Sequence, residues 1–469
     1  MLHIDDEYIN AHKFDCKIGL ELESHRISPD GYLSHTANPF DDCRYIDRDF
    51  SESQIEINTL PMDSPSSALD FLRQQLYIVH DRLESRRELL WPFSNPPMIR
   101  NADDVPIAVY TGDNVQKLIY RQHLAEYYGK YMMTYSGIHY NYSFSDDILM
   151  HNFNIDVKNQ SIDCAKTKHL CHPELDSGSH SLHITEMLKQ VQHDSSHLDS
   201  LNAQNAEDYK TYKEKFYLHL AQQVLAHSWM VVALLAASPI ADNSFFEVGK
   251  SDKSVFTGFS SLRCSEHGYW NIFSPVLDYS SIEAYTNSIE SYLHQGLLAQ
   301  ASELYYPVRL KPVGSYTLDN LRKNGISHIE LRMIDLNPFS ESGVALSDLE
   351  FIRLLLVYLA SQNAALLTQR DQLQALQNHK NASNYDWDIA RITLGSKSLS
   401  LTEALSEKLN QIQSFYADSP QAIAILSAQW DKLNSKSSRY AYRVRAEYGK
   451  DYIGSGIRRA KQIQEYYNV

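Results

Sequence analysis

Residues 17–24 read Lys-Ile-Gly-Leu-Glu-Leu-Glu-Ser and alternate between apolar and polar side chains. Successive side chains of a β-strand point to opposite faces of the sheet, so Glu21 and Glu23 share one face while Ile18 and the leucines share the other. The stretch predicts a strand that buries its apolar face and carries two neighbouring carboxylates on its polar face.

Three other stretches show the same alternation. The polar positions are Gln54, Glu56 and Asn58 in residues 49–58, with Asp49 just upstream of them, His139 and Asn141 in residues 137–144, and Glu330 and Arg332 in residues 327–335. The solvated side of an ordinary antiparallel sheet explains any one of these strands. Four polar faces that hold carboxylates, a histidine and an arginine, with almost no lysine, favour a shared polar site instead.

Such a site predicts bound metal. If the four strands form one sheet, five carboxylates repel one another unless cations lie between them. The candidate ligands are Glu21, Glu23, Asp49, Glu56, His139 and Glu330. Oxygen ligands with one imidazole suit Mg²⁺ or Mn²⁺. A metal cluster beside Arg332 is typical of a phosphoryl-transfer site, in which metals bridge the phosphates and a guanidinium stabilises the transferred group.

Helical patterns are mixed with these strands. Apolar residues recur at spacings of three and four in 66–89, 207–236, 346–378, 402–417 and 438–467, and Ser64 is a candidate helix cap. Without a regular strand–helix–strand rhythm, the sequence predicts an α+β fold rather than a doubly wound sheet. We interpret the Gly454-Ser-Gly456 stretch as a helix break.

Composition excludes several classes of protein. The 469 residues carry a formal net charge of −15, so nucleic acid and anionic membranes are not expected partners. The five cysteines form no CxxC pair, which favours a reducing cytosol over a disulfide framework. The amino-terminal residues lack a signal-peptide pattern, and the longest apolar run, residues 229–237, is too short for a membrane span. A cytoplasmic protein is expected.

Residues 155–206 differ in composition from the rest of the chain. They lose apolar periodicity and are rich in Ser, Asp and His, with six histidines between His169 and His197. A metal site is one interpretation, but the spacings match no known ligand pattern. A solvated loop inserted at the surface accounts better for the composition, so we expect one catalytic domain over 1–469 with a surface insertion at 155–206.

Familiar catalytic motifs are missing from the sequence. There is no GxxxxGK[ST] phosphate loop, no GxSxG nucleophile turn and no HExxH helix. Nucleotide, if bound, is therefore expected to be held through metals.

At these residues the chain resembles the glutamate–cysteine ligase family of bacteria. The stretches that carry the resemblance are Gly19-Leu-Glu-Leu-Glu23, residues 49–56, Leu90-Trp-Pro-Phe-Ser-Asn-Pro96, Tyr120-Arg121, residues 135–141, Ala237-Ser-Pro239, Ser261-Leu-Arg263 with Gly268-Tyr-Trp-Asn271, Glu303-Leu-Tyr305 and residues 329–339. They run in family order from about residue 17 to 345, and the region after about 380 contributes little.

The resemblance implies a glutamine-synthetase-like fold, in which a curved, mainly antiparallel sheet surrounded by helices forms an active-site funnel. It implies ligation of the glutamate γ-carboxylate to the cysteine amine through γ-glutamyl phosphate, with ATP as co-substrate, as the first step of glutathione synthesis. It assigns metal binding to the six ligands named above. It also implies that Arg332 contacts the transferred phosphoryl group and that Arg263 binds the α-carboxylate of glutamate. The residues that it implies for the cysteine pocket are Phe50, Tyr120, Arg121, Leu124, Tyr269 and Tyr305.

The chain departs from the family pattern at one informative place. The family commonly has Gln-Thr-Ile before Ser-Gly, whereas this chain has Met133-Thr-Tyr135. A thioether scarcely hydrogen-bonds, so the identity of the amine substrate stays open. A related carboxylate–amine ligase with another acceptor and a noncatalytic homologue are the alternatives. The length of the chain leaves no room for the ATP-grasp module of bifunctional relatives, so we expect only the first step, performed by a monomer.

Overall fold

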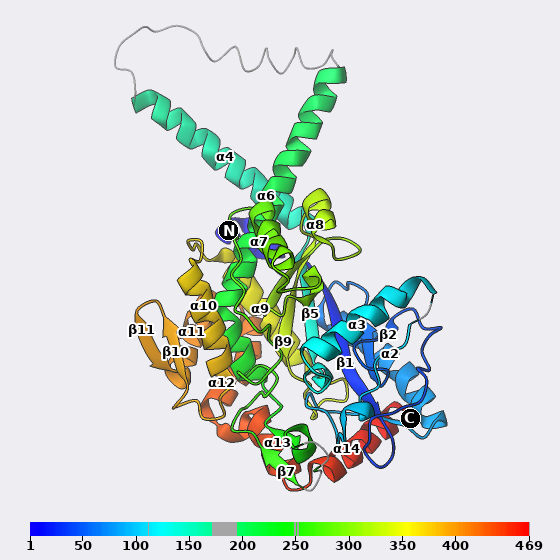
Figure 1. The fold of residues 1–469 in the computed structure, drawn as a ribbon. Helices are drawn as coiled ribbons and strands as arrows, with labels where there is room; N and C mark the ends of the chain where they lie inside the picture. The colour runs from blue at the N-terminus through cyan, green and yellow to red at the C-terminus, as the bar shows by residue number, and fades with distance from the viewer. Residues whose placement is uncertain (111, 171–194, 248–249, 251–252, 469) are drawn as a thin grey trace, which may run out of the picture.

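An antiparallel sheet forms the centre of the protein (Figure 1). The computed structural model describes residues 1–110, 112–170, 195–247, 250 and 253–468. The strands are β1 (Cys16–Ile27), β2 (Ile46–Arg48), β3 (Gln54–Asn58), β4 (Leu89–Leu90), β5 (Ile138–Phe144), β8 (Val308–Lys311) and β9 (His328–Ile334). Their order is β2-β3-β1-β5-β9-β8, and β4 pairs with β1. The four predicted strands are thus adjacent in one sheet, and the predicted α+β class is confirmed.

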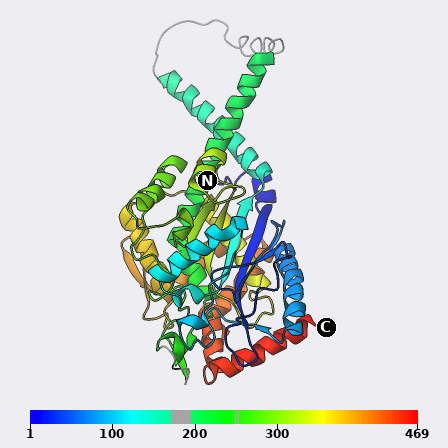
Figure 2. The ribbon, with the colours of Figure 1, turned by 45° about the vertical axis from the view of Figure 1, so that its right-hand side comes forward.

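Long helices cover the apolar face of this sheet. They are α2 (Pro65–Ser85), α6 (Ser195–Leu235) and α9 (Leu346–Ser361), and their buried side chains join those of β1, β3, β5 and β9 in one hydrophobic core. Figure 2 shows α2 alongside the sheet, with the carboxyl-terminal helix passing its end. The apolar face of each alternating strand is therefore buried in the core, and its polar face is free to line a cavity.

The remaining elements surround this centre. The helices are α1 (Glu7–His12), α3 (Val115–Tyr127), α4 (Asp146–Leu170), α7 (Ile282–His294), α8 (Leu318–Asn324), α10 (Gln369–Ala382), α11 (Leu401–Phe415), α12 (Pro420–Asn434), α13 (Tyr440–Tyr448) and α14 (Tyr452–Tyr467). Two hairpins pair β6 (Ile240–Asp242) with β7 (Ser254–Phe256) and β10 (Arg391–Leu394) with β11 (Lys397–Ser400).

Local sequence explains where the predicted helices begin and divide. Ser64 caps α2 as predicted, because its side chain accepts a hydrogen bond from the Ser67 N–H. The pattern at 346–378 is two helices rather than one, since Thr368 and Asp371 form a capping box that starts α10. The pattern at 438–467 likewise divides into α13 and α14.

The interpretation of Gly454-Ser-Gly456 as a helix break is wrong. Both glycines lie inside α14, whose cap is Asp451. A Cβ atom on Gly456 would lie 2.2 Å from the Trp91 ring, so this position lacks a side chain because the helix packs closely against an indole.

The expected insertion at 155–206 is only partly described. Residues 155–170 and 195–206 are helical, as the ends of α4 and α6, so the loop prediction is wrong for them. Figures 1 and 2 show these helices projecting from the body of the protein. Four of the six histidines, His172, His180, His183 and His193, lie outside the described residues. The single-domain organisation stays a prediction.

Part of α6 meets the length and composition of a membrane-spanning helix. This part is Ala206–Leu235, and 83% of its most apolar window is buried inside the protein. The core helix of a globular fold has the same properties, so this segment is explained by its packing on the sheet.

Candidate active site

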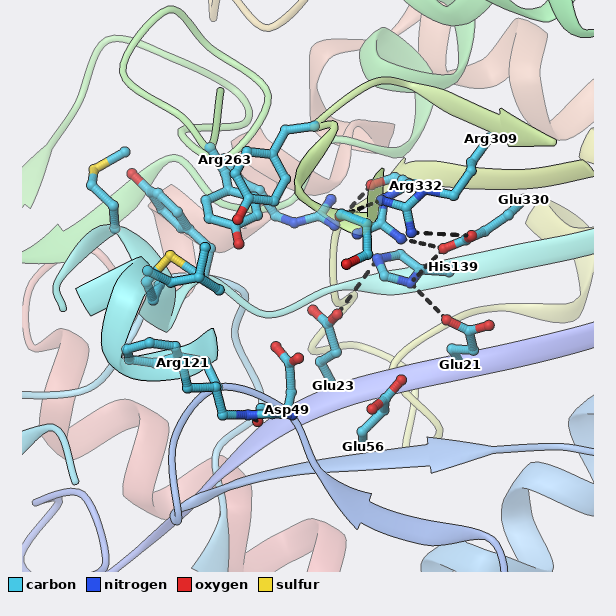
Figure 3. Close-up of a pocket in the computed structure, with 18 of the residues that line it drawn as sticks. Glu21, Glu23, Asp49, Glu56, Arg121, His139, Arg263, Arg309, Glu330 and Arg332 are labelled. Atoms are coloured by element: carbon cyan, nitrogen blue, oxygen red, sulfur yellow. Dashed lines mark hydrogen bonds and ion pairs between the residues drawn. The ribbon is translucent and has the colours of Figure 1, made fainter. Parts of the chain in front are cut away.

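The polar face of the sheet lines a cavity of about 220 Å³ (Figure 3). Its lining includes every residue that the sequence analysis proposed for the site: Glu21, Glu23, Asp49, Phe50, Glu56, Tyr120, Arg121, Leu124, His139, Arg263, Tyr269, Tyr305, Glu330 and Arg332. These residues come from β1, β3, β5, β9, α3 and the connecting loops. The alternation, which pointed to the carboxylates, His139 and Arg332, and the resemblance, which supplied the others, therefore led to side chains that the fold brings together across more than three hundred positions of sequence.

Strand register places the acidic residues against one another. Glu23 lies opposite Glu56 across β1 and β3, and Glu21 lies opposite His139 across β1 and β5. The register between β5 and β9 shifts between Ile138 and Tyr140, so that two β9 residues, one of them Arg332, face His139. A bulge of this kind redirects a side chain at the edge of a functional site.

His139 is the centre of a compact group of possible metal ligands. Its Nδ1 atom lies 2.9 Å from Glu21 Oε2 and 3.4 Å from Glu330 Oε1, and its Nε2 atom lies 3.5 Å from Glu23 Oε1. One ligand atom each from Glu21, His139 and Glu330 lies within 4.8 Å of the others. These carboxylate oxygens and one imidazole fit a hard divalent cation, which accords with the predicted Mg²⁺ or Mn²⁺.

Burial and charge shift the pKa values of these carboxyl groups in opposite directions. Burial and the nearby Asp49 carboxylate raise the pKa of Glu56 to about 8, and the same two causes raise the pKa of Glu23. Burial also opposes ionisation of Glu330, but Arg332, Lys311 and Arg309 together hold the pKa of Glu330 well below its usual value. In this site the charge of Glu330 is already neutralised by protein cations. The ionised forms of Glu23 and Glu56 are not, so a metal ion would stabilise them.

Three basic side chains surround Glu330. Arg332 forms an ion pair with Glu330 Oε1, Lys311 Nζ lies 3.1 Å from Oε2, and Arg309 Nη1 lies 3.7 Å from Oε2. Figure 3 shows Arg309 and Arg332 directed at this carboxylate. Glu330 is fully buried, so each of these charges acts at short range in a poorly hydrated environment.

Sequence reasoning missed Arg309 and Lys311. Both lie on β8, where they alternate with the buried Val308 and Leu310, which is the pattern that revealed the other four strands. β8 is only four residues long and follows Pro307, so its alternation gives a weak signal. Met132, Met133, Tyr135 and Ser302 also line the cavity.

Arg263 enters the cavity beside a glycine. Its Nη2 atom donates a 2.8 Å hydrogen bond to the Arg332 carbonyl. A Cβ atom on Gly137 would lie 2.7 Å from the Arg263 Cζ atom and 2.8 Å from the Ile334 carbonyl oxygen. The glycine therefore makes the space through which the guanidinium passes.

Arg121 and the aromatic residues form the other side of the cavity, well separated from Arg309 in Figure 3. The Arg121 guanidinium donates hydrogen bonds to the backbone carbonyls of Asp49, Arg48 and Lys117. The Tyr269 and Tyr305 rings lie 3.9 Å apart between centroids. This side offers a fixed cation next to a wall of rings, which suits a small amphiphilic molecule with a carboxylate.

A protein-family model matches most of the sequence. The model described as glutamate-cysteine ligase matches residues 3–171, 190–296 and 270–382. The bifunctional glutathione biosynthesis protein GshAB of Listeria innocua is 30% identical over 479 residues, covering 98% of this chain and 56% of that protein. The chain thus spans about half the length of this relative. The glutamate–cysteine ligase of Clostridium acetobutylicum is 26% identical, with 95% of this chain and 90% of that protein covered.

Solved structures share the fold. A bifunctional glutathione synthetase from Pasteurella multocida superposes with a TM-score of 0.76 at 23% identity, over 100% of this chain and 55% of that chain. A glutamate–cysteine ligase from Francisella tularensis, solved in complex with AMP, gives a TM-score of 0.77 at 19% identity, over 97% of this chain and 89% of that chain. These likenesses confirm the predicted fold, and with the family match they establish that the chain belongs to the glutamate–cysteine ligase family.

Proposed function

We propose that this chain joins the γ-carboxylate of L-glutamate to the amine of L-cysteine at the expense of ATP, the first step of glutathione biosynthesis. ATP first transfers its γ-phosphoryl group to the γ-carboxylate, forming γ-glutamyl phosphate and ADP. The cysteine amine then attacks the acyl carbon, the bond from that carbon to the phosphate oxygen breaks, and phosphate and a proton are released. The observation that carries the proposal is the group of metal-ligand side chains next to Arg332 in one cavity.

Each side of the cavity supports a different part of this reaction. A divalent ion such as Mg²⁺ or Mn²⁺ would be held by Glu21, Glu23, Asp49, Glu56, His139 and Glu330. When bound, it would supply positive charge that neutralises phosphate oxygens during transfer. Arg332 lines the same cavity and forms an ion pair with Glu330, which supports its assignment to the transferred group. Arg263 lies between this region and the aromatic wall, where it suits the α-carboxylate of glutamate.

The acceptor amine is assigned to the aromatic side of the cavity. Arg121 has N–H groups left over after its three backbone hydrogen bonds, so it can hold the carboxylate of cysteine. Phe50, Leu124 and Tyr305 belong to one buried cluster, with Tyr120 and Tyr269 packed against it. These apolar surfaces suit the thiol-bearing side chain. A cytoplasmic location and a monomeric state stay predictions.

One measurement tests the proposal directly. Phosphate release is followed with ATP, Mg²⁺ and glutamate, with and without cysteine, and the product is identified by mass spectrometry. A cysteine-dependent γ-glutamylcysteine peak supports the proposal. Phosphate release without this product points to another acceptor, and no release with any acceptor contradicts the assignment as a ligase.

A second candidate differs only in the acceptor. Met133, where the family commonly has glutamine, is buried in the same cluster as Phe50, Leu124 and Tyr305. An apolar side chain here favours an apolar acceptor more than an amide would. Comparing cysteine with 2-aminobutyrate and alanine separates the two candidates, because a ligase for cysteine prefers the thiol by a wide margin in kcat/KM.

A further inference from the structure

We propose that Glu303, a buried residue of the segment before β8, is a positioning residue for the acceptor amino acid. It holds the end of α3 and the segment that carries Tyr305 in the arrangement that encloses this substrate. The inference rests on the proposed function, since it concerns how the aromatic side of the same cavity binds cysteine. Glu303 is not among the described residues that line the cavity, and it received no role from the alternation or the resemblance.

The helix α3, which carries Tyr120, Arg121 and Leu124 of the acceptor pocket, has little apolar packing of its own. Of its residues, all of which the structure describes, only Leu124 is buried, whereas α2 buries nine. A segment with few buried apolar contacts opens locally at a low free-energy cost. The position of α3 therefore depends on the polar contacts at its two ends.

The first half of α3 is held by β2 and the residue after it. Arg121 donates hydrogen bonds to the carbonyls of Asp49 and Arg48, and Lys117 Nζ lies 3.0 Å from Asp47 Oδ2. The Lys117 and Asp47 side chains are 46% and 41% exposed, so their ion pair contributes little to stability. Fixing the whole helix therefore requires a second attachment at its carboxyl-terminal end.

Glu303 makes this second attachment from the interior of the protein. Its Oε1 atom accepts a 2.9 Å hydrogen bond from the hydroxyl of Tyr128, the residue that follows α3, and its Oε2 atom accepts one of 2.7 Å from the Ala299 N–H. The Nε2 atom of His123, on α3 itself, lies 3.4 Å from Oε2. The Glu303 side chain is 1% exposed, and hydrogen bonds to a carboxylate are stronger than those between neutral groups. These contacts therefore anchor the end of α3 to the segment before β8.

Asn271 extends this network to the two tyrosine rings of the cavity wall. Its Nδ2 atom donates hydrogen bonds of 3.0 Å to the Tyr128 hydroxyl and 2.8 Å to the Glu303 backbone carbonyl, and its Oδ1 atom accepts one of 2.9 Å from the Tyr305 N–H. Asn271 lies two residues after Tyr269 in the sequence. The Tyr128 ring packs edge-on against the Tyr305 ring, 5.3 Å away between centroids. One network therefore joins the end of α3 to both segments that supply the rings.

The network requires a side chain at position 303 that only accepts hydrogen bonds. The Tyr128 hydroxyl accepts a hydrogen bond from Asn271, so its own proton points at Glu303, and the Ala299 N–H is a second donor directed at the same carboxylate. A carboxylate accepts both, whereas a glutamine amide has one oxygen and turns its NH₂ group toward one of the two donors. Glu303→Gln therefore keeps the size of the side chain and disturbs only the network.

The first experiment measures the Michaelis constant of each substrate separately. In Glu303→Gln we expect the KM for cysteine to rise ~10-fold or more, because the pocket wall shifts, while kcat and the KM values for ATP and glutamate stay within ~3-fold. Asp348→Asn is the matched control. Asp348 is a buried carboxylate that accepts hydrogen bonds of 2.7 Å from Lys432 Nζ and from the Tyr440 hydroxyl, and none of these three residues lines the described cavity. This variant should lose stability yet keep the original KM for cysteine.

The second experiment tests whether Glu303 acts through Tyr128. Tyr128→Phe should raise the KM for cysteine, and Glu303→Gln combined with Tyr128→Phe should have a KM for cysteine no higher than that of Glu303→Gln alone. In the double variant the glutamine oxygen can face the Ala299 N–H, since no hydroxyl proton competes for it. Independent damage at the two positions would instead add the two losses.

The third experiment needs no substrate. Hydrogen exchange followed by mass spectrometry should show the amides of α3 exchanging at least ~5-fold faster in Glu303→Gln than in the original chain, with the amides of α2 unchanged. Asp348→Asn should leave the exchange of α3 as it is.

The outcomes separate this inference from the proposed function. If the original chain makes γ-glutamylcysteine and Glu303→Gln changes no KM, or changes all three alike, the positioning role is wrong while the ligase proposal stands. Unchanged exchange of α3, or strictly additive losses in the double variant, also overturn the positioning role. If the original chain joins glutamate to no amine at all, the proposed function fails, and the acceptor role of Glu303 fails with it even where α3 exchanges faster.

Discussion

Glu23 on β1 lies directly opposite Glu56 on β3, so a buried carboxyl group and a half-buried one face each other across one rung of the sheet. Neither lies within ion-pair distance of an arginine or lysine in the described part of the chain, and the pKa of Glu56 is raised to about 8 by burial and by Asp49. A bound cation would therefore stabilise the ionised form of this pair more than that of the other carboxyl groups in the site.

The first prediction concerns the pH dependence of stability. Because the folded pKa of Glu56 lies above its unfolded value of 4.5, the folded state retains a proton that the unfolded state loses as pH rises from 4.5 to 8. The melting temperature of the metal-free protein should therefore fall more between pH 5 and pH 8 than that of Glu56→Gln. Differential scanning calorimetry in EDTA measures both. Parallel curves for the two proteins would contradict the raised pKa.

The second prediction concerns metal binding. Glu21→Gln and Glu330→Gln each remove one oxygen ligand from the cluster around His139, so affinity for Mn²⁺ should fall more than ~100-fold and turnover should be abolished. Electron paramagnetic resonance of free Mn²⁺ measures the affinity. Glu283→Gln, on the exposed start of α7, is the control. An unchanged Mn²⁺ affinity in both cavity variants would remove these residues from the ligand set.

The third prediction uses the space beside Arg263. In Gly137→Ala the new Cβ atom would meet the guanidinium, so the KM for glutamate should rise ~10-fold or more while the KM for ATP changes little. Gly19→Ala is the matched control in β1, because its Cβ atom would make only ordinary contacts, the closest at 3.5 Å from Asn141. Steady-state kinetics with each substrate varied in turn makes the comparison. A rise in KM for ATP alone would contradict the position given to glutamate.

The fourth prediction concerns the insertion. Among the described residues, those that line the cavity lie no later than His139 or no earlier than Arg263, and the end of α4 and the start of α6 project from the body (Figure 1). Replacing residues 171–194 with a short glycine–serine linker should therefore leave kcat/KM within ~2-fold. Circular dichroism melting checks the fold of the variant. Loss of activity in a variant that melts at the original temperature would give the segment a role in catalysis.

The sequence predicted the strands well because the physical signal was strong. In β1, β3, β5 and β9 each polar face carries at least one charged residue or a histidine, so alternation was visible without knowledge of the neighbours. The resemblance supplied the residues that alternation cannot reach, such as Arg263, which enters from a loop. Neither the alternation nor the resemblance identified Arg309 and Lys311. A four-residue strand repeats its pattern only twice, so its alternation is a weak signal.

Helix boundaries were harder to predict for a different reason. The break at the start of α10 depends on the reciprocal hydrogen bonds of Thr368 and Asp371, which outweigh a continuous apolar pattern. Gly456 lies within α14 because Trp91, far away in sequence, occupies the space where a side chain would be. Tertiary contacts of this kind leave no trace in local periodicity.

The pairing of β5 with β9 has a consequence for how the protein is made. The bounds of these strands leave 183 residues between Phe144 and His328. During synthesis β1, β3 and β5 leave the ribosome long before β9, so the nascent chain presents its first carboxylates and His139 before Glu330 and its arginine and lysine partners exist. Contacts between such distant segments form slowly. Tight metal capture is therefore a late event, and it marks the point at which the sheet is complete.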